Sequence, residues 1–71
     1  MPLAMIREGT KAILRSIHGG RGLRGRLAAL GLVPGAEVTV LRNGGRGPFV
    51  VAVNNARICI GRGMAMKIEV D

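Results

Sequence analysis

The hydrophobic and polar positions along the chain alternate in several short runs, a pattern that is typical of half-buried β-strands. Two of the runs flank Asn54-Asn55, a pair that can adopt the left-handed backbone conformation of a tight hairpin. The strands that this pattern predicts are Lys11–Ile17, Glu37–Val40, Phe49–Val53, Ala56–Ile60 and Lys67–Val70. Five short strands in a chain of 71 residues indicate a small, mainly β barrel.

The segment between the first two strands has a helical period instead. Leu23, Leu27 and Leu30 recur at i, i+4 and i+7. Gly31 then stands where a helix ends in a left-handed residue, and Leu32 follows at the position that contacts Leu27 in a Schellman cap. We therefore expect one short α-helix that ends next to Gly31.

Glycine- and proline-containing segments separate these elements. Pro34 and Gly35 suit the two central positions of a type II turn. Leu3 and Ile6 are expected to pack against the barrel before Gly9 turns the chain into the first strand. Further loops and connectors are expected at residues 18–22, 43–48 and 61–66. Because no repeat or linker interrupts the pattern, residues 1–71 are interpreted as one all-β domain with five strands and one short α-helix.

Length and composition narrow the range of functions. The core of a 71-residue chain is thin, and a cleft with several buried catalytic groups would occupy most of it. We therefore expect neither an enzyme nor a cofactor. The longest uncharged runs, residues 27–36 and 47–56, are too short to span a membrane. Since the start of the chain does not resemble a signal peptide and Cys59 is the only cysteine, we expect a cytoplasmic protein.

Metal-binding side chains are few. His18 and Cys59 are the strongest candidate ligands, but they show no ligand spacing such as HxxxH or CxxC. His18 is expected in an exposed loop, and Cys59, between two isoleucines, is expected to pack as a small hydrophobic residue. Met64 and Met66 are expected to fill the core. The sequence therefore predicts no dedicated metal site, and no nucleophile with an orienting base.

The net charge of +7 points instead to an acidic partner. Arg21, Arg24 and Arg26 cluster at the start of the predicted helix, and Arg42 and Arg46 flank the long loop. The glycines before the helix could bind an anion, but they match neither a Walker loop nor a dinucleotide fingerprint. Nucleic acid is the alternative partner, although a single aromatic residue leaves little for bases to stack on.

The chain resembles the FeoA family, the small cytoplasmic proteins of bacterial ferrous iron uptake. The most specific element is Leu30-Gly31-Leu32-x-Pro34-Gly35, and the motifs that agree with it extend over almost the whole chain. In order, these motifs are the Val38/Val40 strand, the Gly47-Pro48 turn, the Asn54-Asn55 hairpin and Ala65-x-x-Ile68-x-Val70.

The resemblance implies an SH3-like β-barrel that is an accessory to FeoB, the membrane iron transporter with a cytoplasmic GTPase domain. No nucleic acid partner is then expected, whereas self-association and direct binding of iron or another transition metal ion stay open. We expect the helix and its exit to form the partner surface, with arginines that steer the encounter. The residues expected there are Arg21, Arg24, Arg26, Leu30, Leu32 and Pro34.

Overall fold

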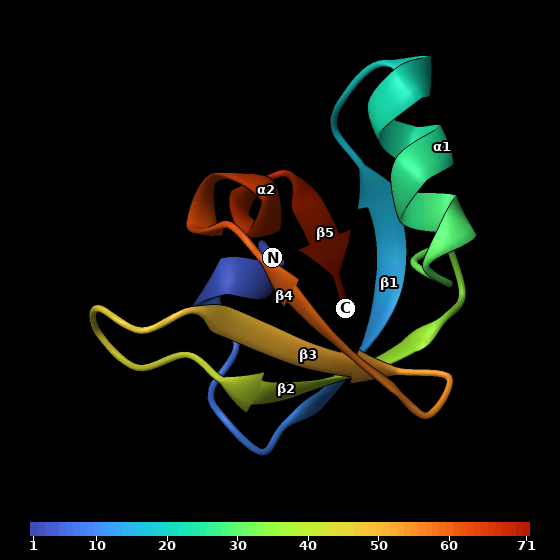
Figure 1. Cartoon of the computed structure of the whole chain (residues 1–71). Coiled ribbons are helices and arrows are strands. Elements are labelled where there is room, and N and C mark those ends of the chain that lie inside the picture. Colours follow the sequence, from blue (N-terminus) through green and yellow to red (C-terminus); the bar gives the residue numbers. More distant parts are fainter.

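All five apolar runs form strands in the computed structural model, which describes every residue from Met1 to Asp71 (Figure 1). A 3-10 helix, η1 (Leu3–Met5), precedes them, and two α-helices, α1 and α2, interrupt them. The strands and α-helices are β1 (Lys11–Ile17), α1 (Arg21–Ala29), β2 (Glu37–Arg42), β3 (Phe49–Val53), β4 (Ala56–Ile60), α2 (Arg62–Met66) and β5 (Ile68–Val70).

The strands pair antiparallel in the order β4-β3-β2-β1-β5. The hairpin between β3 and β4 turns on Asn54 and Asn55, whose φ angles of 50° and 65° are those of a type I′ turn, as predicted. At the other edge, Pro2 forms an isolated bridge with Glu69 of β5, so the N-terminal segment lies beside the last strand.

The sheet curves because β1 divides its pairing between two partners. Its first half, Lys11–Ile13, pairs with β2, and its second half pairs with β5. The β1–β5 register shifts between Leu14 and Ser16, so an extra residue, Arg15, bulges out of the strand. A second shift, between Val40 and Arg42, bends β2 in the same way. Bulges of this kind let a short sheet close on itself.

One hydrophobic core of 15 buried residues fills the inside of the curved sheet. Alternate residues of β3 point inward, with Phe49, Val51 and Val53 almost fully buried. Leu3 and Ile6 are also buried, as expected from the sequence. The molecule measures 29 × 22 × 20 Å, and α1 projects from the barrel alongside β1 (Figure 1).

Four boundaries differ from those that the sequence predicts. α1 begins at Arg21, inside the loop expected over residues 18–22. β2 continues past Val40 to Arg42, because its bulge lets pairing with β3 resume, and β5 begins one residue later than expected. The connector over residues 61–66 contains a helix, α2, in spite of its two glycines. In a helix, residues two apart point to nearly opposite sides. Met64 therefore packs against the core, whereas Met66 is exposed, which corrects its expected place in the core.

Candidate functional site

The exit of α1 has the geometry that its sequence predicts. Gly31 has a φ of +92°, its N–H donates to the Ala28 carbonyl at 2.9 Å, and the Leu32 N–H donates to the Leu27 carbonyl at 2.9 Å. These two bonds define a Schellman cap. Leu27 and Leu32 are both buried, so the apolar contact of the motif fastens the end of α1 to the barrel.

The turn after the cap ties the same segment to β1. The Ala36 N–H donates to the Val33 carbonyl at 3.0 Å around Pro34 and Gly35, as a type II turn requires. The Gly35 N–H then donates to the Leu14 carbonyl at 2.7 Å. The helix exit is therefore held at both ends, by the cap and by the middle of β1.

A groove of about 240 Å³ lies between α1, the helix exit and the end of β1. Four of its seven lining residues are hydrophobic, and the lining contains one charged side chain, Arg24. The lining residues are Ser16, Ile17, Arg24, Ala28, Leu32, Val33 and Pro34. The groove thus has an apolar floor and a cationic rim.

The three helical arginines are all exposed but do not share one face of α1. At about 100° per residue, Arg21 and Arg24 lie about 60° apart around the helix axis, and Arg26 lies about 160° from Arg24. Arg24 lines the groove, whereas Arg21 and Arg26 do not. The structure therefore gathers Arg24, Leu32 and Pro34 of the expected partner surface and directs Arg26 elsewhere.

The two leucines of the expected partner surface have different environments. Leu30 is 48% exposed at the end of α1 and is free to contact another molecule. Leu32 is 0% exposed, because the Schellman cap turns its side chain into the core. The expectation that Leu32 presents an apolar edge is therefore wrong. It forms the floor of the groove instead.

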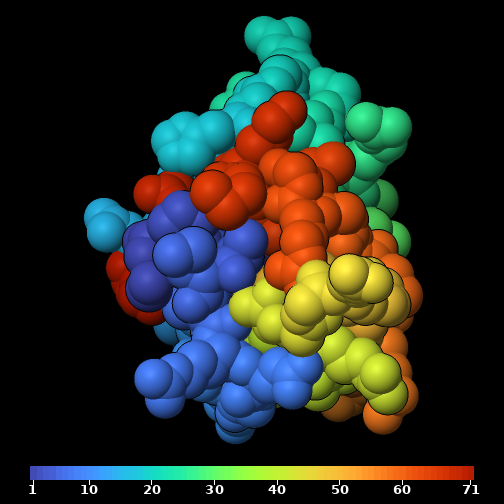
Figure 2. All heavy atoms as spheres, turned by 90° about the vertical axis from the view of Figure 1, so that its left-hand side faces the viewer, coloured from blue at the N-terminus to red at the C-terminus, as the bar shows by residue number.

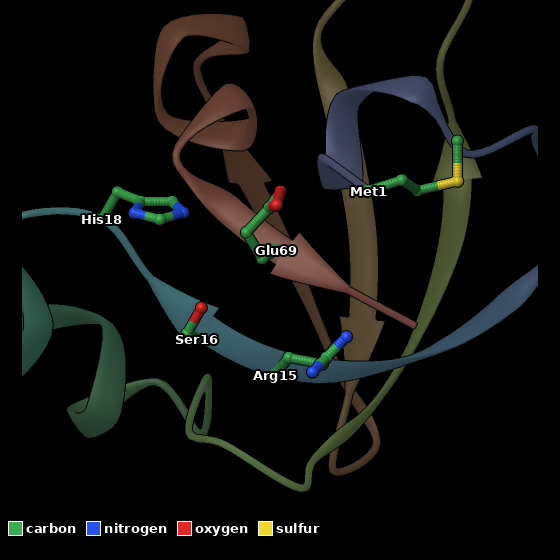
Figure 3. A pocket seen from close by; sticks show the side chains of 5 residues that line it. All are labelled: Met1, Arg15, Ser16, His18 and Glu69. Carbon is green, nitrogen blue, oxygen red and sulfur yellow. The ribbon is translucent and has the colours of Figure 1, made fainter.

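A second depression, of about 350 Å³, is polar and lies over the β1 bulge. The bulge places Arg15 and the next residue, Ser16, at the surface together, and Glu69 of β5 pairs with Ser16. His18 is exposed, as expected, and its imidazole is directed towards Glu69 (Figure 3). Arg15 forms an ion pair with Asp71 at 3.1 Å. Met1 completes the lining.

Cys59 is exposed, which corrects the expectation that it packs as a small hydrophobic residue. Its neighbour Ile58 is 9% exposed and points into the core. Successive side chains of a strand point to opposite faces, so Cys59 must point outward. The continuous apolar run Ile58-Cys59-Ile60 conceals this alternation in the sequence.

The candidate metal ligands do not assemble into a site. His18 follows the end of β1, and Cys59 lies on the edge strand β4. No group of three or more His, Cys, Asp or Glu side chains gathers anywhere in the chain. Dedicated transition-metal sites in proteins have three or four such ligands. The donors present therefore do not fit a dedicated metal site built from this chain alone.

A clasp of side-chain hydrogen bonds, centred on Asn43, holds the N-terminal segment to the barrel. The Asn43 Nδ2 donates to the Ala4 carbonyl at 2.9 Å and to the Ile6 carbonyl at 2.7 Å. The Asn43 Oδ1 accepts from the Arg62 Nη1 at 2.7 Å, and the backbone N–H of Asn43 donates to Glu8 Oε1 at 2.8 Å. Figure 2 shows the segments involved, the N-terminus, the loop after β2 and α2, side by side on one face.

The Arg62 guanidinium lies 5.9 Å from the centroid of the Phe49 ring, and its Nη2 is buried without a partner. Sequence reasoning missed this arrangement. Asn43 precedes two glycines and is typical of a turn, and no spacing in the sequence pairs it with residues 4 and 6.

Neither α-helix has the length and apolar character needed to cross a bilayer. The curved five-stranded antiparallel sheet is that of an SH3-like barrel, and in this chain a short helix follows its first strand. The model of the FeoA domain family matches residues 1–71. The chain belongs to the FeoA family, which comprises accessory proteins of ferrous iron transport.

Individual relatives agree with this assignment. The chain is 40% identical over 70 residues to a Methanocaldococcus jannaschii protein named "Putative Fe(2+) transport protein A", covering 99% of this chain and 84% of that one. A crystal structure of an iron uptake regulatory protein, FeoA, has a TM-score of 0.90 at 37% identity, over 99% of this chain and 93% of the other. A zinc complex of FeoA from Stenotrophomonas maltophilia, described as a prokaryotic SH3 domain protein, has a TM-score of 0.84 at 30% identity, over 100% and 89%.

Proposed function

We propose that the protein is a non-enzymatic docking module of cytoplasmic ferrous iron transport. It binds the cytoplasmic part of a FeoB-type GTPase-transporter and modulates iron uptake. Membership of the FeoA family supports the transport context. The groove between α1 and β1, with Arg24 at its rim, is the observation that carries the docking role.

The charge distribution supports a partner with an acidic surface. Lys11 and Arg15 form ion pairs with Glu37 and Asp71, and the other nine basic side chains have no carboxylate partner. A cationic surface of this kind accelerates the encounter with an acidic protein more than it strengthens the final complex. Arg21, Arg24 and Arg26 steer the partner, Pro34 contacts it at the wall of the groove, and Leu30 contacts it beside the groove.

Binding to the cytoplasmic part of the transporter tests this proposal. The association rate is measured at about 20 mM and about 300 mM NaCl, because added salt screens charges at the surface. We expect a stable complex at low salt and slower association at high salt. Lack of retention at low salt would contradict the proposed function.

The basic side chains without a carboxylate partner also favour nucleic acid as an alternative partner. The only aromatic residue, Phe49, is 1% exposed and is therefore inaccessible to bases. Without exposed aromatic rings, single strands would bind through their phosphates alone. Titration with a random oligonucleotide at the two salt concentrations distinguishes the partners, because submicromolar binding with a steep salt dependence would favour nucleic acid.

A further inference from the structure

The volume of the groove between α1 and β1 limits what can occupy it. Pockets for small ligands and cofactors have volumes of about 300–1,000 Å³, and this groove, at about 240 Å³, lies below that range. It has room for one or two side chains of another protein. The apolar residues Ile17, Ala28 and Val33 in its lining favour an apolar side chain as one of these occupants.

The positive charge at the groove indicates the sign of the charge on the partner segment that carries this apolar side chain. Arg24 is the one charged residue in the lining, and Arg21 lies one helical turn before it. The first turn of α1 contains no acidic residue, so the positive end of the helix dipole is not neutralised. An acidic segment fits this setting, whereas a basic one would meet an uncompensated positive potential.

The walls of the groove are fixed before any partner arrives. The Schellman cap places Leu32 in the floor, and the bond from the Gly35 N–H to the Leu14 carbonyl holds the wall that contains Pro34. A preformed site loses little conformational freedom on binding, so a single well-placed side chain can contribute strongly.

We propose that the groove is the receptor for an apolar anchor side chain in an acidic segment of the partner protein. The anchor lies between Ile17, Ala28 and Val33, and Arg24 pairs with a carboxylate that flanks the anchor in the partner sequence. This proposal rests on the proposed function in taking the partner to be a protein of iron transport.

Synthetic peptides test the groove without the transporter. The probe is an amphipathic peptide of leucine and glutamate, compared with one in which lysine replaces glutamate and one in which serine replaces leucine. We expect the leucine–glutamate peptide alone to bind and to shift the backbone amide signals of Ile17, Ala28 and Val33. Equal binding of the lysine peptide, or shifts confined to other parts of the molecule, would overturn the proposal.

Matched variants of α1 assign the binding to the groove. Ala28→Gln fills the groove, and Ala29→Gln makes the same change at an exposed neighbour outside it. We expect the dissociation constant of the leucine–glutamate peptide to rise at least about tenfold in Ala28→Gln and to stay within about twofold in Ala29→Gln. Equal effects of the two changes would overturn the proposal.

A second pair of variants separates local pairing from net charge. Arg24→Glu and Arg26→Glu lower the net charge equally, but only Arg24 lines the groove. We expect Arg24→Glu to weaken binding of the same peptide at least about tenfold, and Arg26→Glu to weaken it only by the part that salt already screens. Equal losses at high salt would overturn the role of Arg24.

The two proposals can fail separately. If the transporter fragment binds the protein but the peptide does not, the groove proposal is wrong and the docking function stands. If the peptide binds in the groove and the transporter fragment does not bind at low salt, the docking function is wrong and the groove has another acidic protein partner.

Discussion

Gly31 and Gly35 have the same left-handed φ of +92°, but their surroundings differ. A Cβ added at Gly35 would meet no atom within 4 Å, whereas one added at Gly31 would lie 2.6 Å from the Asn54 Nδ2. We expect Gly35→Ala to lower the free energy of unfolding by about 1–2 kcal/mol, the cost of the left-handed conformation. Gly31→Ala should cost at least as much, because the Asn54 amide must also move.

Urea unfolding of both variants measures the difference between these two costs. Since the two positions share the same backbone angle, Gly35→Ala serves as the control for strain alone. A smaller loss of stability in Gly31→Ala than in Gly35→Ala would show that moving the Asn54 amide costs nothing.

Asn43 is the other residue with a large expected effect. Asn43→Ala removes both donors from the Ala4 and Ile6 carbonyls and the acceptor from Arg62. We expect a loss of about 2 kcal/mol or more in the free energy of unfolding, because partly buried polar groups lose their partners. Arg46→Ala, in the same loop but exposed, should change this free energy by less than about 0.5 kcal/mol. Urea unfolding and hydrogen exchange near the N-terminus measure both effects.

At the level of elements, successive side chains of β4 point to opposite faces of the sheet. One substitution on each face tests this arrangement. Cys59→Ser should leave stability within about 0.5 kcal/mol of the unsubstituted protein, because the thiol is exposed. Ile58→Ser should cost about 2 kcal/mol or more, because Ile58 is buried in the core.

Alkylation of the folded protein tests the exposure of the Cys59 thiol independently of the stability measurements. We expect iodoacetamide to modify Cys59 in the absence of urea nearly as fast as in the unfolded chain. Strong protection of the thiol in the folded protein would mean that β4 is rotated by one residue relative to the register described here.

The elements also show which features of the fold can be predicted from the sequence. Local signals such as the Asn54-Asn55 turn and the glycine after the helix correctly placed the β3–β4 hairpin and the end of α1. They failed where distant segments decide the outcome. The direction of the Cys59 side chain depends on the distant segments that pack against β4. The helical state of residues 62–66 likewise depends on the distant segments that pack against them. No short-range pattern in the sequence contains that information.

The candidate site shows the same difference between local sequence signals and contacts with distant segments. Arg24 and Pro34 were predicted because both belong to one continuous stretch of sequence. Ser16 and Ile17 were not, since they join the groove only because β1 passes beneath the helix exit. The clasp around Asn43 was missed for the same reason, because its partners lie 19 to 39 residues away along the chain.

For the whole molecule, the uneven charge makes salt act in opposite directions on folding and on binding. At about 20 mM salt the screening length is roughly 20 Å, similar to the molecule's own dimensions of 29 × 22 × 20 Å, so the basic side chains repel one another across it. At about 300 mM the screening length falls to roughly 6 Å. We expect the melting temperature to rise over this range, while association with an acidic partner slows.

Thermal unfolding at the two salt concentrations checks this expectation. The double variant Arg42→Glu/Arg46→Glu, which changes two exposed positions outside the groove, should show a smaller rise because it carries less net charge. A melting temperature that falls with salt would mean that the exposed ion pairs outweigh the repulsion.

The clasp around Asn43 also affects how fast the protein deamidates. Asn43 precedes Gly44, and an asparagine before glycine readily loses its side-chain ammonia when the following backbone nitrogen attacks the amide. That attack requires the side chain to rotate, which its hydrogen bonds to Ala4, Ile6 and Arg62 prevent. Each opening of the N-terminal segment exposes the amide to this reaction, and the aspartate that forms cannot restore the two donors. The fraction of molecules that are deamidated at Asn43 therefore increases with how often the clasp has opened.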